Sequence, residues 1–199
     1  MPSSTHVASR WLTATALVLY HGAQRWNGPP SIVPHRKGQA EHGPGIYLTT
    51  SWQTAQRYGK GGGSIYRMTL TRPRRWAENH NFQLDEAIAF TKTTLGRGKR
   101  GKDVIETLEV VSNRMGGGTT VPAFVLINSF VNNNVSVGQN GVKLAEFLVK
   151  HQVDASHVHH SGEDWIVVFN PRIINNVEKL NRKELDDPDF AWDLPRVTR

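Results

Sequence analysis

Among the segments of this 199-residue chain, residues 43–59 constrain the possible fold most strongly. This run begins with Gly-Pro-Gly, which favours a turn, and continues with Ile-Tyr-Leu-Thr, a short β-prone stretch. Ser51, or the threonine before it, then supplies a helix cap, and Gly59 supplies a helix stop. The run therefore predicts a turn, a strand and a helix, with Tyr47 in the strand and Tyr58 at the end of the helix.

Two tyrosines placed in this way allow two interpretations. Tyr47 and Tyr58 could face each other across a slot that holds one flat ring, since stacked rings lie several ångström apart. Such a slot suits a cationic ring, because π faces attract positive charge. In the alternative, both tyrosines are half-buried core residues of a strand–helix unit. This stretch by itself favours the alternative.

Two further motifs lie on either side of this run. The apolar residues 12–20 predict a strand that leads into His21 and Gly22. Near the other end of the chain, Glu163 and Asp164 precede Trp-Ile-Val-Val-Phe, which predicts a second buried strand. Successive side chains of a strand point to opposite faces, so only one of the two acids is expected to enter a cleft formed there.

These three motifs, in this order, resemble the catalytic domains of the poly(ADP-ribose) polymerases and diphtheria toxin. That family carries a His–Tyr–Glu triad, in which the glutamate directly precedes an aromatic residue and an Ile/Val run. The resemblance covers about residues 17–180 and puts Asp164 at the glutamate position, where the acid is one methylene shorter. Glu163 is its rival for this role, and choosing Glu163 shifts the strand register by one residue.

The resemblance implies NAD as the substrate and gives several residues a role. Tyr47 and Tyr58 would sandwich the nicotinamide, and the backbone of Gly22 would pair with its carboxamide, since glycine lets a ligand approach the main chain closely. His21 would bond a ribose hydroxyl. Ser51 would touch the carboxamide, or would serve only as a helix cap.

The same resemblance implies a catalytic set of Asp164, His21 and Tyr47. Asp164 would accept a hydrogen bond from the 2′-hydroxyl of the nicotinamide ribose. Its charge would then stabilise the oxocarbenium-like transition state, and such electrostatic stabilisation is usually the largest catalytic contribution. The acid would also orient or deprotonate the acceptor.

The implied fold is α+β, with a split, mostly antiparallel β-sheet core and flanking helices. A hydrophobic content of 38% with six Trp and seven Phe indicates a globular chain rather than a disordered one. We expect one domain over residues 11–180, preceded by a loose arm at residues 1–10 and followed by a charged tail at residues 181–199.

Spacing predicts the elements between the motifs. Residues 82–115 show a helical pattern with one break, and residues 122–130 and 142–151 predict two more helices. Residues 23–42 predict a long polar loop, and residues 156–160 a short strand before the acidic one.

Positive charge marks candidate contacts to the acceptor. The net charge of +7 and the pI of about 9.9 permit binding to a polyanion without identifying one. Arg97, Lys99 and Arg100 lie on a glycine-rich segment that suits phosphate contact, and equally suits a solvent-exposed loop between helices. Arg74 and Arg75 form a smaller basic cluster beside a tryptophan.

Histidines before the acidic strand are further candidates. His157 and His159 alternate onto one face and are expected to contact the acceptor. A metal site would want a third ligand, and no residue obviously completes one, so we expect no metal. The chain has no cysteine, which excludes disulfides and thiolate metal sites. The sequence shows no apolar run of about 18 residues, so we expect no membrane contact and a cytoplasmic location.

The sequence thus predicts a mono-ADP-ribosyltransferase that moves ADP-ribose from NAD to a nucleic acid or protein acceptor and releases nicotinamide. By analogy with compact family members, it would be a bacterial or phage toxin or effector, with an antitoxin or inhibitor among its partners. One alternative is an inactive module that binds NAD, ADP-ribose or nucleic acid on the same fold. Another is an RNA 2′-phosphotransferase, which would want arginines where Tyr20 and Gly22 stand.

Overall fold

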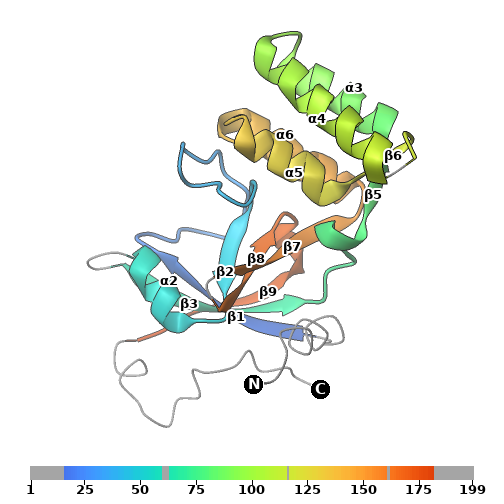
Figure 1. Ribbon diagram of the computed structural model, residues 1–199. Helices are drawn as coiled ribbons and strands as arrows, with labels where there is room; N and C mark the ends of the chain where they lie inside the picture. Colours follow the sequence, from blue (N-terminus) through green and yellow to red (C-terminus); the bar gives the residue numbers. More distant parts are fainter. Residues whose placement is uncertain (1–15, 60–62, 116, 161, 182–199) are drawn as a thin grey trace.

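The computed structural model describes residues 16–59, 63–115, 117–160 and 162–181 (Figure 1). The predicted arm at residues 1–10 and nearly all of the predicted tail lie outside the described residues. The strands are β1 Ala16–Ala23, β2 Ile46–Thr49, β3 Ser64–Thr71, β4 Arg75–Trp76, β5 Asn81–Gln83, β6 Thr120–Pro122, β7 Val153–His160, β8 Glu163–Val168 and β9 Ile174–Lys179. The helices are α2 Trp52–Gly59, α3 Leu84–Leu95, α4 Lys99–Met115, α5 Ala123–Asn132 and α6 Gly138–Lys150, with short 3₁₀ helices at Ala77–Asn79 (η1) and Pro171–Ile173 (η2).

The main sheet runs in the order β4-β7-β8-β2-β1-β3-β9. Its pairings are antiparallel except for the parallel pair of β4 with β7. A small second sheet joins β5 to β6. The protein is therefore α+β with a mostly antiparallel sheet, as the sequence predicted.

Two clusters of buried apolar residues cover the two faces of the main sheet. Side chains alternate between the faces, so Leu48 and Ile166 join one cluster, while Tyr47 and Val167 join the other. We call the side that carries Tyr47 the helix face, because it packs against α2, α5 and α6. The opposite face packs against the long loop after β1, through Trp26 and other apolar residues.

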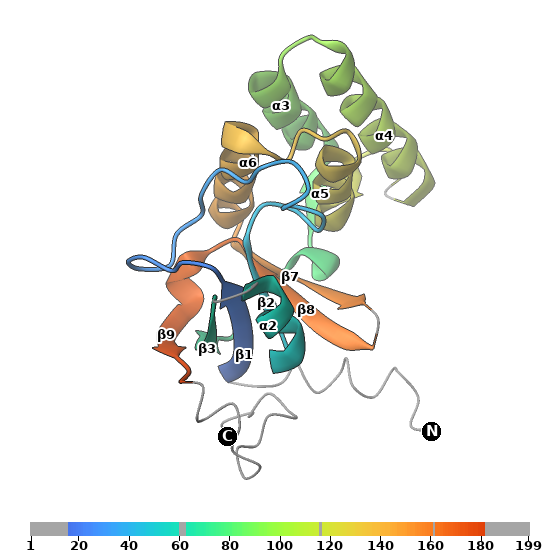
Figure 2. The same cartoon turned by 90° about the vertical axis from the view of Figure 1, so that its left-hand side faces the viewer.

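The four longer helices form two layers. Both views show α5 and α6 next to the sheet, and α3 and α4 on their far side (Figure 1; Figure 2). Stacked aromatic rings join the layers, since Phe90 of α3 lies 4.2 Å from Phe147 of α6 and 5.7 Å from Phe130 of α5, measured between ring centroids. Helices α5 and α6 thus form the layer next to the sheet, and α3 and α4 form the layer beyond it (Figure 1; Figure 2).

The run at residues 43–59 forms the predicted turn, strand and helix, with the strand at Ile46–Thr49 and the helix at Trp52–Gly59. The predicted helical break falls between α3 and α4, where Gly96 has a φ of 69°. That value favours glycine, which has no Cβ to clash.

Other boundaries differ from the prediction. The first strand was expected to end at residue 20, but β1 continues to Ala23 because it pairs with β3 as far as Ser64. Strand β7 begins at Val153 rather than at residue 156, and α6 begins at Gly138 rather than at residue 142. The strands β4, β5, β6 and β9 were not predicted. Three of them are three residues long or shorter, and such short segments carry little periodic signal.

Candidate functional site

Strands β1 and β2 separate after one residue pair. In the described structure the ladder between them consists of Tyr20 opposite Thr49, whereas β1 pairs with β3 along its whole length. The imidazole of His21 lies where the ladder would continue, with Nδ1 2.8 Å from the carbonyl oxygen of Tyr47. We call this place the split of the sheet.

The bond to Tyr47 decides which nitrogen of His21 carries the proton. A carbonyl oxygen only accepts, so Nδ1 donates and Nε2 is the acceptor nitrogen of the neutral ring. Burial lowers the pKa of His21, and the bond to the Tyr47 carbonyl opposes that shift only in part. The ring of Trp26 holds the imidazole from the side, with the centroids 5.0 Å apart. His21 is therefore neutral at pH 7.

The backbone of Gly22 points into the split. Its partner across the ladder, Ile65, uses its carbonyl to accept a hydrogen bond from the amide of Leu180 at 3.0 Å. The amide and carbonyl of a strand residue face the same side, so Ile65 faces β9, and its pair with Gly22 is a non-hydrogen-bonded one. Gly22 therefore directs its own N–H and C=O away from β3 and toward β2.

Gly22 also allows α2 to pack closely on β1. A Cβ at this position would lie 1.6 Å from the carbonyl oxygen of Ala55 in α2. Close packing of α2 therefore requires a glycine at position 22, in addition to the position of Gly22 at the split.

Tyr47 is held by its hydroxyl. The hydroxyl donates to the carbonyl of Gly43 at 2.7 Å and accepts from the amide of His42 at 2.9 Å. Burial raises the pKa of Tyr47, so the phenol stays protonated and cannot act as a base. The ring lies edge-on to His35, with the centroids 6.1 Å apart.

Tyr58 is the exposed counterpart of Tyr47. Its residue is 56% exposed, and its ring stands edge-on to Trp165 with the centroids 5.3 Å apart. Trp165 lies two positions from Val167, which pairs with Tyr47, so both tyrosines and Trp165 lie on the helix face. In the described structure the two tyrosine rings contact different partners rather than each other.

Glu163 lies on the helix face as well. One carboxylate oxygen accepts from the hydroxyl of Thr54 in α2 at 2.7 Å, and the other from the hydroxyl of Thr49 at 3.4 Å. The carboxylate therefore ties α2 to the start of β8.

Asp164 points to the opposite face and is 7% exposed. Its Oδ1 forms hydrogen bonds with Nε2 of His157 at 2.9 Å and with Nδ1 of His159 at 3.0 Å. Burial alone would raise the pKa of Asp164, but the two histidine bonds outweigh it, and the pKa is lowered. Its backbone exchanges two bonds with Thr50, just past the end of β2. The carboxylate is thus ionised at neutral pH.

The structure places the site residues predicted from the sequence in different parts of the sheet. His21, Gly22 and the backbone of Tyr47 meet at the split. Tyr58 shares the helix face with the Tyr47 side chain, whereas Asp164 occupies the other face.

Two other groups of predicted residues take different places. Ser51 caps α2, since its hydroxyl accepts from the amide of Thr54 at 3.2 Å. Arg97, Lys99 and Arg100 are exposed at the junction of α3 and α4, in the layer farther from the sheet (Figure 1). They lie away from the split.

The sequence missed the Thr49 and Thr54 hydroxyls that donate to Glu163. It also missed Glu78, which accepts from the Ser156 hydroxyl at 2.6 Å. No local pattern predicts them, because Thr54 and Glu163 are 109 residues apart in the chain.

Two kinds of feature are absent from the described residues. These residues contain no group of three or more His, Cys, Asp or Glu that could hold a metal ion. Within the same residues, no helix has the length and apolar character needed to cross a membrane.

Comparison with known proteins gives one weak likeness. No family model matches the chain, and no curated protein matches it. A solved structure described as "Crystal structure of an anti-CRISPR protein" aligns over 85% of this chain and 98% of its own, with 12% sequence identity and a TM-score of 0.37. A likeness at that level carries no argument about fold or function.

Proposed function

We propose that the protein is an NAD-dependent mono-ADP-ribosyltransferase. It would transfer ADP-ribose from NAD to a nucleophilic group of a macromolecule, releasing nicotinamide and a proton. The observation that carries this proposal is the anchoring of His21 at the split of the sheet. The anchored ring leaves Nε2 as an acceptor beside the outward-facing backbone of Gly22.

These groups match the polar parts of a nicotinamide nucleoside. Nε2 of His21 would accept a hydrogen bond from a ribose hydroxyl. The N–H of Gly22 would donate to the carboxamide oxygen, and its C=O would accept from the carboxamide NH₂. Tyr47 and Tyr58 lie on one face near this place, and their aromatic rings suit a flat cation.

The choice of acid follows from what already binds each carboxylate. Both oxygens of Glu163 accept from threonine hydroxyls and tether α2. Asp164 receives both histidines on Oδ1, and no described residue donates to its Oδ2. We therefore keep Asp164 as the residue that would stabilise the developing positive charge on ribose, with Glu163 as the alternative.

Nicotinamide release is the direct test. The wild-type protein would be incubated with NAD labelled in the nicotinamide ring and with RNA, DNA or a cell lysate as acceptor. We expect release that Asp164→Asn lowers by about 10²- to 10³-fold, the usual effect of losing an electrostatic contribution to the transition state.

Glu163→Gln is the matched control, because Gln keeps an oxygen that accepts from Thr54. We expect its nicotinamide release to stay within a few-fold of wild type. The reverse order of the two variants would make Glu163 the acid. Saturable NAD binding without release in any mixture would refute the transferase and support a binding module instead.

A further inference from the structure

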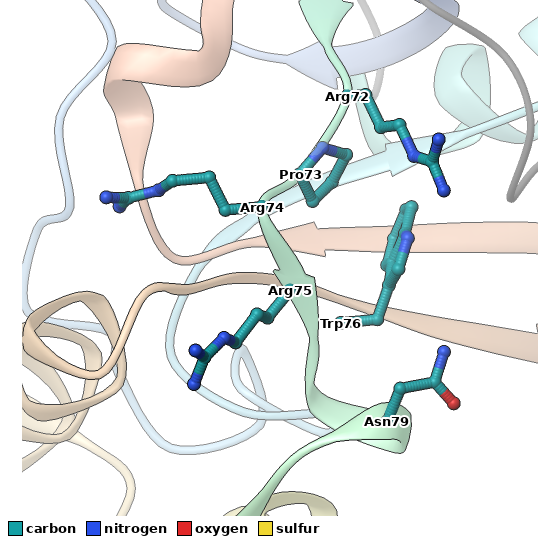
Figure 3. Close-up of a pocket in the computed structure, with 6 residues that line it drawn as sticks. All are labelled: Arg72, Pro73, Arg74, Arg75, Trp76 and Asn79. Atoms are coloured by element: carbon teal, nitrogen blue, oxygen red, sulfur yellow. The ribbon is translucent and has the colours of Figure 1, made fainter.

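A surface cavity of about 540 Å³ lies at β4, one of the two edge strands of the main sheet. Its lining residues are Arg72, Pro73, Arg74, Arg75, Trp76 and Asn79. Figure 3 shows Arg72 on the same side of the strand as Trp76, and Arg74 and Arg75 on the other side. A second cavity of about 510 Å³ shares Arg72 and Arg74 and adds Arg172. We call Arg72, Arg75 and Arg172 the arginine edge.

No carboxylate in the described residues forms an ion pair with the arginine edge. Among the residues that line the two cavities, Asp154 is the acidic one, and its side chain is fully buried. Arg74 takes that carboxylate with two guanidinium bonds of 2.8 and 3.0 Å, which makes the pair neutral. The side chains of the arginine edge are exposed and have no carboxylate partner in the described part of the chain. The segment around β4 thus carries exposed positive charge on both of its sides, at Arg72 and at Arg75 (Figure 3), and no carboxylate in the described residues pairs with either of them.

Trp76 forms part of the cavity wall. It is 5% exposed and lines the cavity, and its buried Nε1–H has no hydrogen-bond partner among the described residues. Buried donors without an acceptor are rare in native structures, because the lost hydration is not repaid. Because this nitrogen is itself buried, a ligand in the open cavity does not reach it.

Trp76 and His157 connect the cavity to the acid of the proposed reaction. The ring of Trp76 lies edge-on to His157, with the centroids 6.2 Å apart, and His157 bonds Asp164. By contrast, β7, β8 and β2 separate β4 from β1, a distance of about 19 Å at the usual strand spacing. Trp76 of this cavity therefore contacts the histidine that bonds Asp164.

From these contacts we infer that the acceptor of the proposed transfer is a nucleic acid strand, held through its phosphates by Arg72, Arg75 and Arg172. This inference rests on the proposed function. Exposed, uncompensated guanidinium groups suit a chain with one negative charge on every nucleotide, because binding releases the counterions of that chain. The net charge of +7 adds long-range attraction for the same partner.

Binding is tested without NAD, so that its result does not depend on the transferase activity. Labelled single-stranded DNA and RNA oligonucleotides would be titrated with protein over a series of salt concentrations, with fluorescence anisotropy as the readout. The test variant replaces all three arginines of the arginine edge with Gln. The matched control replaces Arg97, Lys99 and Arg100 with Gln, which removes the same charge from the outer helices.

We expect the arginine-edge variant to bind at least tenfold more weakly at low salt. The slope of log affinity against log salt concentration should fall by about 2 to 3, since each lost phosphate contact removes nearly one unit. The control variant should lose less than threefold in affinity. All six residues are exposed, so unchanged urea midpoints would confirm that both variants are folded.

Several results would overturn the inference. Equal losses of affinity in the two variants would mean that net charge alone, and not the arginine edge, attracts the oligonucleotide. Displacement of the oligonucleotide by NAD would mean that the cavity is part of a dinucleotide site. Nicotinamide release with the ADP-ribose label on protein alone would leave the proposed function intact and make the acceptor a protein. Oligonucleotide binding with no nicotinamide release under any condition would instead refute the proposed function, and the acceptor role with it.

Discussion

The contact between β1 and α2 can be tested by one methyl group. In Gly22→Ala, the added Cβ would lie 1.6 Å from the carbonyl oxygen of Ala55 and 2.9 Å from the amide nitrogen of Gly59. An ordinary contact is about 3.5 Å, so α2 would have to move by about 2 Å. Because both atoms belong to backbone, no side-chain rotation can relieve the clash.

The cost follows from what that movement breaks. The bond from Thr54 to Glu163 is 2.7 Å long and would be lost. A hydrogen bond to a charged group contributes about 1.5–3 kcal/mol, and overpacking costs about 1–3 kcal/mol. We expect the free energy of unfolding to fall by about 3–5 kcal/mol. In a chain of this size, that corresponds to a melting temperature about 6–20 °C lower.

Thermal unfolding followed by circular dichroism would measure this change. Gly98→Ala is the matched control, because a Cβ there meets no atom within 4 Å and the backbone is not left-handed; its melting temperature should stay within about 2 °C of wild type. Thr54→Val removes only the bond to Glu163 and should lose about half as much stability as Gly22→Ala. If Gly22→Ala had the same melting temperature as the Gly98→Ala control, the packing of α2 on β1 described above would be refuted.

Three other perturbations have defined outcomes. Asp154→Ala should lower the urea unfolding free energy by about 3 kcal/mol, since it leaves Arg74 and the buried amide of Asn170 without their acceptor; an unchanged midpoint would contradict this. Burial lowers the pKa of His21 in the folded protein. Below pH 6.5 the His21 side chain is therefore protonated in the unfolded chain but still neutral in the folded one. The free energy of unfolding should then fall as the pH drops from 6.5 through the folded-state pKa of His21. Burial would raise the pKa of Asp154, but the bonds from Arg74 and Asn170 lower it, so a second loss should begin below pH 3.8; a stability that is flat from pH 7 to 4 would refute the first part. Tyr58→Ala should weaken NAD binding about tenfold in calorimetry while Tyr58→Phe keeps it, because the ring face attracts the cation, and equal binding by both variants would remove Tyr58 from the nucleotide site.

The prediction from sequence was most accurate where neighbours along the chain decide the outcome. Turn-forming glycines, a β-prone stretch and a capping serine produced the strand and helix of residues 43–59 at nearly the predicted boundaries. Alternation along a strand correctly predicted that Glu163 and Asp164 point to opposite faces. Both results depend on dihedral preferences and side-chain periodicity, which act over a few residues.

The prediction was weaker where a residue's role depends on a distant partner. Arg74 was grouped with the exposed basic residues, yet it neutralises a buried aspartate 80 residues further along the chain. His157 and His159 were predicted as acceptor contacts, and the sequence did not foresee that both also bond the carboxylate of Asp164. No spacing in the sequence encodes either contact.

The sequence by itself determined the local elements, the positive charge, and the histidine, tyrosines and acids from which a site could be built. Only the tertiary structure decided that the His21 ring interrupts the ladder at the Tyr47 carbonyl, 26 residues away in the chain. Strand order alone brought Trp76 of β4 against His157, the histidine that bonds Asp164. The physical reason is that local preferences are satisfied within one turn or strand, whereas these contacts exist only after β1, β2, β4, β7 and β8 have packed into one sheet.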